Sequence, residues 1–292
     1  MSKTDSKGMP PPESGSRNMT ASKSPQPKAG PSPQFFAYLR HEKTRKNAIL
    51  GSQLALLAIF FGAWEFFPRM GWVNPLFTSY PSALWPTFIS MLMDGSLLGH
   101  AWSTVFATMV GFALSMIFGI IVAAMIWWSN FAYKVLDPFL VLANAMPKTA
   151  FVPIFYVWLG STYSVYGIAI AIALFITIMM VYNGFQNIDP NKMKLLRTFG
   201  ATRWQILTKV IIPGSVPTLI ATLKISFGLS LVGVVVGEFQ SSNSGLGYLI
   251  LYGSQIFQFN LVMTAITVLA IISGLIYLVI FQLEKAVLRR HA

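Results

Sequence analysis

Cysteine is absent from this sequence of 292 residues, and charged side chains are scarce, at 10% of all residues. Without cysteine there is no disulfide framework, no thiolate metal site and no cysteine nucleophile. Soluble domains carry about 25% charged residues. The shortage of charge, combined with a hydrophobic share of 54%, indicates an integral membrane protein.

Acidic residues and histidines are also few, with nine acids and three histidines. The histidines His41, His100 and His291 lie in separate parts of the chain, so they form no catalytic or metal-ligating constellation. A glycine-rich phosphate loop is missing as well. We therefore expect no catalytic residue, no metal and no cofactor in this chain, which disfavours a membrane-embedded enzyme. Scarce acids also make an autonomous ion-coupled carrier a remote alternative.

The first 34 residues are rich in serine, proline, glycine and lysine and nearly devoid of large apolar side chains. Such a composition buries too little surface to offset chain entropy. We predict a disordered cytosolic tail over 1–34 and a basic juxtamembrane segment over 35–47. The first apolar run begins near Ala48 without a cleavage pattern behind it, so no cleaved signal peptide is expected.

Apolar runs of about 20 residues, the length that crosses a bilayer, dominate the region 48–285. The predicted fold class is an all-α integral membrane protein with six transmembrane helices. One span contains Pro147, Lys148 and Pro153, and a broken helix at membrane depth needs protein or a water-filled cavity beside it. We therefore predict that this span lines a pathway. The six spans are expected at about 48–67, 103–127, 137–159, 164–182, 215–236 and 261–282.

Lysine and arginine are distributed unevenly among the connections between spans. Nine precede residue 47 and five lie within 183–213, whereas the outer connections hold only Arg69. Basic residues mark the cytoplasmic side of membrane proteins. Both termini, including a basic C-terminus over 286–292, are therefore predicted to be cytosolic. This placement also explains the positive net charge without nucleic acid as a partner.

The cytosolic segment 187–213 has the signals of two helices joined by a hinge. Asp189 and Pro190 predict a capped helix start, and Gly200 predicts the end of that helix. A second helix is expected from Thr202 to Pro213. Its apolar positions suggest a docking surface for another protein. These positions are Met193, Leu196, Phe199, Trp204 and Leu207.

This segment resembles the coupling loop of ABC importer permeases. The pattern is Glu-Ala-Ala, three residues, Gly, nine residues, an aliphatic residue, any residue, Leu and Pro, and Gly200, Val210 and Pro213 match it at the required spacing. Ile212 replaces the Leu, and Lys194 stands at the acidic position. The resemblance implies that the ATPase-coupling residues are Lys194, Leu195, Leu196, Phe199, Gly200, Ala201, Val210 and Pro213.

Further stretches, among them "YPSALW" and "GLGYLI", are similar to permease subunits of nitrate, sulfonate and taurine importers over about residues 50–285. The resemblance implies a type I importer permease fold in a bacterial-type plasma membrane. It also implies a homodimer of this chain, a cytosolic ATPase dimer that binds ATP and Mg²⁺, and an extracytoplasmic substrate-binding protein. The implied substrate is a small anion such as a sulfonate, taurine or nitrate. Pyrimidine vitamin precursors and riboflavin, carried within the same group, are alternatives.

Two interpretations stay open for the ionisable residues of the spans. Lys148 either faces an anionic solute or marks a helix break from which its ammonium extends to water. For Lys224 we expect an ammonium that extends to water. Glu238 either lines the outer mouth or caps a following helix. Aromatic and methionine side chains fit plain packing as well as a pathway. The predicted pathway residues are Asn144, Met146, Lys148, Tyr156, Trp158 and Glu238.

Overall fold

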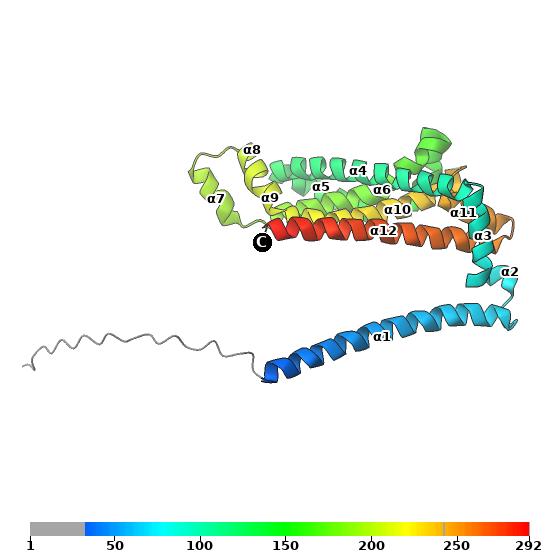
Figure 1. Cartoon of the computed structure of the whole chain (residues 1–292). Helices are drawn as coiled ribbons and strands as arrows, with labels where there is room; N and C mark the ends of the chain where they lie inside the picture. The colour runs from blue at the N-terminus through cyan, green and yellow to red at the C-terminus, as the bar shows by residue number, and fades with distance from the viewer. Residues whose placement is uncertain (1–32, 242, 292) are drawn as a thin grey trace, which may run out of the picture. The chain divides into compact units, whose positions relative to one another are not determined.

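A computed structural model describes residues 33–241 and 243–291, and every regular element within these ranges is a helix (Figure 1). The predicted tail lies outside the described ranges except for its last two residues. The chain divides into two compact units, residues 1–58 and 59–292, which are described separately. Helix α1 (Pro33–Arg69) contributes residues to both units.

The described part of the first unit is the beginning of α1. All side chains from 43 to 58 are exposed, among them Ile49, Leu54 and Leu56. Glu42 and Lys46, one helical turn apart, form an ion pair at 2.7 Å. A lipid bilayer is as apolar as these exposed side chains. Residues 43–58 therefore have the surface of a lipid-facing helix.

The second unit opens with the end of α1, which is tied to the connection that follows it. The Glu65 carboxylate accepts hydrogen bonds from the backbone N–H of Ser82, at 3.0 Å, and from its hydroxyl, at 2.7 Å. Arg69 pairs with the same carboxylate at 2.6 Å. Because Ser82 belongs to the first turn of α3, these bonds fix where that helix starts. The connection contains α2 (Pro75–Thr78) and α3 (Pro81–Met93).

Five further helices lie side by side in the second unit (Figure 1). They are α4 (Ser96–Trp128), α5 (Asn130–Ala145), α6 (Val152–Gln186), α10 (Val216–Ser241) and α12 (Phe259–His291). Short helices close the two ends of this bundle (Figure 1). At one end are α7 (Pro190–Thr198), α8 (Arg203–Ile206) and α9 (Ile212–Gly214), and at the other are α3 and α11 (Leu246–Gln255).

The start of α4 is fixed by Asp94. Its carboxylate accepts a hydrogen bond from the backbone N–H of Ser96 at 2.8 Å, which satisfies a donor that the helix itself leaves unpaired. The side-chain and backbone hydrogen bonds from Ser96 lower the pKa of Asp94. The carboxylate is therefore charged at neutral pH, as suits a helix N-terminus.

The centre of the bundle is a close approach of α4, α6 and α10 around Ala169. A Cβ added to Gly111 would lie 2.7 Å from the Cβ of Ala169, and one added to Gly233 would lie 2.6 Å from its Cα. Real side chains do not tolerate such distances. Small residues at these positions let the three backbones approach one another, which is the usual basis of helix association in membranes.

Many polar side chains inside the bundle form hydrogen bonds within it, whereas the buried hydroxyls of Ser230 and Thr264 have no partner among the described residues. The hydroxyls of Thr108, Ser115 and Thr177 each donate to the backbone carbonyl four residues earlier, at 2.7–2.8 Å. Thr177 of α6 also shares a hydrogen bond with Ser226 of α10. An unpaired hydroxyl costs free energy in an apolar interior, so these bonds allow polar residues at membrane depth.

An ion pair joins α10 to α12. Lys224 pairs with Glu284, and its ammonium lies 5.2 Å from the centroid of the Phe281 ring. The side chains of Lys224 and Glu284 are only 22% and 20% exposed. The expectation that Lys224 extends toward water is therefore wrong. Its charge is balanced inside the helix pair because a partly buried ammonium is more stable beside a carboxylate.

Five helices within the described residues are long and apolar enough to cross a membrane, namely 42–69, 96–128, 148–186, 216–240 and 259–286. The predicted span 137–159 is divided instead. Helix α5 ends at Ala145, and Met146 is extended because the following Pro147 disfavours a helical conformation before it. A 3₁₀ turn, η1 (Lys148–Phe151), then leads into α6.

Helix α6 itself is interrupted at Gly160, whose φ of 74° and ψ of 176° are not helical. The predicted spans 137–159 and 164–182 therefore correspond to the 16-residue α5, a short segment over 148–159, and the long part of α6 that follows Gly160. At 1.5 Å per residue, α5 is about 24 Å long, which is less than the roughly 30 Å of a bilayer core.

The close approach at Ala169 makes Gly233 intolerant of a side chain. We expect Gly233→Val to destabilise the protein by about 1–3 kcal/mol, since its Cβ would meet the backbone of α6. The measurement is the apparent melting temperature in detergent. Gly228→Val is the matched control, because a Cβ at Gly228 of the same helix meets nothing within 4 Å. Equal melting temperatures for the two variants would contradict this packing.

Candidate functional site

Helix α7 is held at both ends by the residues that predict its limits. The Asp189 side chain accepts a hydrogen bond from the backbone N–H of Asn191 at 2.8 Å, and Pro190 is the first helical residue. At the other end, Gly200 has a φ of 76°. The backbone N–H of Ala201 donates to the carbonyl of Leu196 at 3.0 Å. This is a glycine-based helix stop that requires a positive φ.

The two sides of α7 have different surroundings. Met193 and Leu196 pack against a buried cluster formed by α4, α6 and the segment after α8, and Ala201 packs there too. Leu195 and Phe199, one turn apart on the other side, are 57% and 78% exposed. We call the exposed side, Leu195 and Phe199, the docking face. Of the predicted apolar docking positions, Met193 and Leu196 serve to anchor the helix.

The second predicted helix, Thr202 to Pro213, starts with a reciprocal cap. The backbone N–H of Gln205 donates to the Thr202 hydroxyl at 3.3 Å, and the Gln205 side chain accepts from the Thr202 backbone N–H at 2.8 Å. The helix then widens into a π-helical turn, η2 (Leu207–Ile211), and continues through α9 into α10. Proline has no backbone N–H, and its ring clashes with the carbonyl four residues earlier in a regular α-helix. A wider π-helical turn before Pro213 is consistent with this constraint.

The same segment divides its apolar side chains between inside and outside. Ile206 and Leu207 are buried in the cluster that anchors α7. Trp204 is 63% exposed, and its ring centroid lies 6.4 Å from that of Trp128. Leu207, predicted as a docking position, is therefore part of the core. Val210 is partly buried, and Pro213 and Lys194 are exposed.

Three of the predicted pathway residues meet at the break after α5. The Lys148 ammonium donates to the Asn144 backbone carbonyl at 2.8 Å, and Met146 lies between them and is 42% exposed. The ammonium also lies 6.0 Å from the centroid of the Phe175 ring. In a regular helix the backbone N–H of Lys148 would donate to the Asn144 carbonyl, so the ammonium replaces a donor that is lost at the break.

Tyr156 and Trp158 lie on the short helical segment before Gly160, and they are 46% and 76% exposed. Neither lines a cavity with Glu238, which belongs to a separate part of the bundle. The structure therefore places the six predicted pathway residues at three locations. These are the break, the segment before Gly160 and the far end of α10.

Glu238 is buried at the end of α10, with 2% of its surface exposed. Its carboxylate accepts hydrogen bonds from the Thr104 hydroxyl at 2.8 Å and from the backbone N–H of Gly247 at 2.8 Å. The Thr104 hydroxyl in turn accepts from the backbone N–H of Leu246 at 2.7 Å. Because Leu246 and Gly247 form the first turn of α11, Glu238 and Thr104 together cap this helix. Glu238 thus has the contacts that the helix-capping interpretation predicts, and it also lines the cavity described below.

Glycines and His100 complete this arrangement. A side chain at Gly245 or Gly247 would overlap the Glu238 carboxylate. His100 accepts a hydrogen bond on Nδ1 from the backbone N–H of Gly245 at 3.0 Å. Its ring stacks on Tyr248 with 5.9 Å between centroids. These contacts join α4, α10 and α11 at one end of the bundle.

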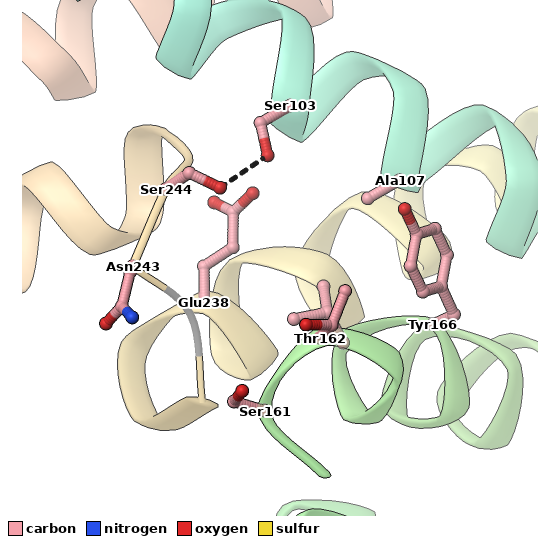
Figure 2. Close-up of a pocket in the computed structure, with 9 residues that line it drawn as sticks. Ser103, Ala107, Ser161, Thr162, Tyr166, Glu238, Asn243 and Ser244 are labelled. Carbon is pink, nitrogen blue, oxygen red and sulfur yellow. Dashed lines mark hydrogen bonds between the residues drawn. The ribbon is translucent and has the colours of Figure 1, made fainter. Parts of the chain in front are cut away.

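A cavity of about 180 Å³ opens beside Glu238, and we call it the serine cavity (Figure 2). Hydroxyls from α4, from the start of the long part of α6 and from the α10–α11 connection surround it, and Ser103 and Ser244 share a hydrogen bond at 3.0 Å. The sequence analysis missed these residues because they are far apart along the chain. The lining includes Ser103, Ser161, Thr162, Tyr166, Asn243 and Ser244.

Such a wall can bind a polar group through hydroxyl donors and acceptors. In the ranges 33–241 and 243–291, His, Cys, Asp and Glu do not gather in groups of three that could hold a metal ion.

The comparisons with known proteins identify the family. Residues 115–291, more than half of the chain, match the family described as the inner membrane component of binding-protein-dependent transport systems. The chain belongs to this family. It is an inner-membrane permease component of an ABC importer, with the type I permease fold expected from the coupling loop.

Several curated relatives are permeases of sulfonate importers. The chain is 27% identical to the putative aliphatic sulfonates transport permease SsuC of Bacillus subtilis, over 86% of this chain and 91% of that protein. It is 24% identical to the taurine transport system permease TauC of Escherichia coli, over 82% and 89%. It is also 28% identical to the formylaminopyrimidine transport permease ThiX of Halalkalibacterium halodurans, over 54% and 63%.

Solved structures share the fold. A chain of the inward-facing MetNI methionine ABC transporter superposes with a TM-score of 0.58 and 21% identity, over 65% of this chain and 96% of that one. A chain of an amino acid ABC transporter gives a TM-score of 0.54 with 16% identity, over 70% and 98%. These similarities confirm the architecture of the bundle with its terminal helices.

The cap on α11 predicts a specific effect of Thr104→Val. Removal of the hydroxyl leaves Glu238 short of a donor and the Leu246 N–H short of an acceptor, and each loss costs about 1–3 kcal/mol. We expect amides of residues 246–255 to exchange hydrogen roughly tenfold faster or more. Thr108→Val is the matched control, because Thr108 is equally buried on α4 and bonds only within its own helix. Unchanged exchange in Thr104→Val would refute the cap.

Proposed function

We propose that this chain forms the translocation pathway of an ABC importer as a homodimer, and that a cytosolic ATPase dimer docks on α7. In this assembly ATP and Mg²⁺ are bound by the ATPase, and this chain binds no cofactor. An extracytoplasmic binding protein delivers the substrate. The family description, which specifies binding-protein-dependent transport, supports these partners.

The observation that carries the proposal is the division of α7 into an anchored side and an exposed side. Leu195 and Phe199 are large apolar side chains at the end of the bundle, outside the long helices that cross the membrane (Figure 1). Exposed apolar groups in such a place indicate a protein partner. The opposite side of the helix is packed into the core, so a force on the docking face reaches the bundle directly.

We further propose that both termini and α7 face the cytosol. Five basic residues between 183 and 213 support this orientation, because lysine and arginine are retained on the cytoplasmic side. The location is the plasma membrane of a bacterial-type cell. The serine cavity, at the other end of the bundle from α7, then faces outward.

For the substrate we propose a small anion of the sulfonate or taurine type. The names of two relatives that match over most of their length support this class. Transport of a pyrimidine vitamin precursor is the second candidate, and the shorter match to ThiX supports it. We assign Asn144, Met146 and Lys148 to the pathway, because the break places a cation and non-helical backbone among helices long and apolar enough to cross a membrane.

The test of the assembly is purification of the tagged chain from its native membrane in mild detergent, followed by mass spectrometry. Recovery of a soluble ABC ATPase in about equal amounts is expected. A chain that is stable and repeatedly purified alone would favour an autonomous carrier.

The test of the substrate is deletion of the gene. Deletion is expected to abolish uptake of labelled taurine or an alkanesulfonate. Loss of formylaminopyrimidine uptake alone would favour the second candidate.

The helix stop at Gly200 gives a sharp prediction for coupling. Gly200→Val is expected to reduce ATPase co-purification and transport about tenfold or more, because a β-branched residue resists a φ of 76°. Gly200→Asn is the matched control, since asparagine tolerates this conformation. Phe199→Ala removes an exposed side chain of the docking face. It is expected to weaken binding of the ATPase without changing the melting temperature of this chain. Normal ATPase recovery and uptake in Gly200→Val would refute the prediction.

A further inference from the structure

A second cavity, of about 250 Å³, lies where α7 and α8 meet the ends of α4 and α6. Trp127 and Trp128 from the end of α4 form one side of it, and Gln186 from the end of α6 forms another. Arg197 of α7 and Arg203 of α8 bring two guanidinium groups to its lining. We call it the arginine cavity.

The two guanidinium groups lack an acidic partner in the described part of the chain. The ion pairs found there involve other residues. Arg203 donates from Nη1 to the backbone carbonyl of Trp128 at 2.8 Å, which uses one of its five N–H donors and fixes the side chain at the end of α4. The cavity therefore holds positive charge and preorganised donors that a phosphate or carboxylate oxygen could accept.

The arginine cavity and the docking face lie on different sides of α7. Arg197 follows Met193 by one helical turn, and both line the cavity on the side that faces the bundle. Leu195 and Phe199 lie on the opposite side and are exposed. A protein partner on the docking face would thus leave the cavity and its positive charge open to a separate counterion.

The level of the cavity in the membrane identifies that counterion. Trp128 is the last residue of one membrane-crossing helix, and Gln186 is the last residue of another. The cavity therefore lies where the apolar spans stop, at the depth of the lipid headgroups. Trp128 is 41% exposed, so an apolar surface for an acyl chain adjoins the charged wall. A free phosphate would use only the charged part of this surface.

We propose that the arginine cavity binds the phosphate of an anionic phospholipid headgroup, between the guanidinium groups of Arg197 and Arg203. Basic pockets at the ends of membrane helices bind such headgroups through charge and hydrogen bonds. The lipid would connect the end of α4 to α7 and α8. The proposal depends on the residues of the arginine cavity and on its level in the membrane, and it holds for any substrate or ATPase.

The experiment measures lipid retention by the full chain, purified together with its ATPase if one co-purifies. The complex is reconstituted in bilayers of dioleoylphosphatidylcholine with one tenth dioleoylphosphatidylglycerol, and retained lipid is counted by native mass spectrometry. Wild type is expected to be enriched in phosphatidylglycerol. The double variant Arg197→Gln with Arg203→Gln is expected to lose this enrichment roughly tenfold.

The control double variant is Lys192→Gln with Lys209→Gln. It removes the same charge from exposed positions of the same segment that do not line the cavity, and it should keep the enrichment. The single variant Arg197→Gln should lower the enrichment in phosphatidylglycerol about threefold. It leaves the hydrogen bond of Arg203 in place, so it tests the site even if the double variant misfolds. The double variant Arg197→Lys with Arg203→Lys should keep part of the enrichment, because it keeps the charge.

Three results would overturn the proposal. Equal losses in the arginine and lysine double variants would show a general charge effect. Displacement of phosphatidylglycerol by millimolar inorganic phosphate would show a site for free phosphate. Normal lipid retention with loss of the ATPase in the arginine variants would show that the cavity is part of the protein interface.

Discussion

The bundle depends on the missing side chains at Gly111 and Gly233. Helix α6 contacts both α4 and α10, and a side chain at either glycine would overlap Ala169. In a bilayer the surroundings of a helix are as apolar as its own side chains, so helices associate through close packing and internal hydrogen bonds. The hydrogen bond between Thr177 and Ser226 belongs to the same contact surface.

The ionisable groups Glu238 and Lys224 inside the bundle both have polar partners. Glu238 is surrounded by the Thr104 hydroxyl and a backbone N–H, whereas Lys224 has a carboxylate partner on α12. A buried charge without such partners would cost several kcal/mol. The acid at the end of α10 is thus a structural element, and the serine cavity beside it is polar because its wall is built of hydroxyls.

Local signals in the sequence predicted local structure. Asp189, Pro190 and Gly200 act through their own backbone and nearest neighbours, and they limit α7 as expected. Pro147 likewise predicted the break after α5, because it excludes a helical residue before it. The family resemblance, which rests on the spacing from Gly200 to Pro213, predicted the type I fold.

Other features depend on tertiary contacts that a single sequence does not contain. Gly160 is non-helical and Gly167 is helical, although both are glycines in the same apolar run. Which side of α7 turns inward is decided by the cluster beneath it, so Leu196 and Phe199 were equivalent in the sequence and differ in the structure. Residues of the serine cavity, such as Ser103 and Ser244, are brought together only by folding.

The packed cluster under α7 and the breaks in the long helices indicate how the proposed importer transmits force. The cluster under α7 includes Ile126 of α4 and Phe185 of α6, and a close-packed cluster moves as a unit because its interior has no space to deform. A displacement of the docking face would therefore move the adjoining ends of α4 and α6 together. Continuity of the helical backbone is interrupted elsewhere, at Met146–Pro147 and at Gly160. Hinges are positions that absorb changes in φ and ψ. The segment 148–159, which lies between these two interruptions, is therefore the part of the bundle best able to change its orientation while the cluster under α7 stays rigid.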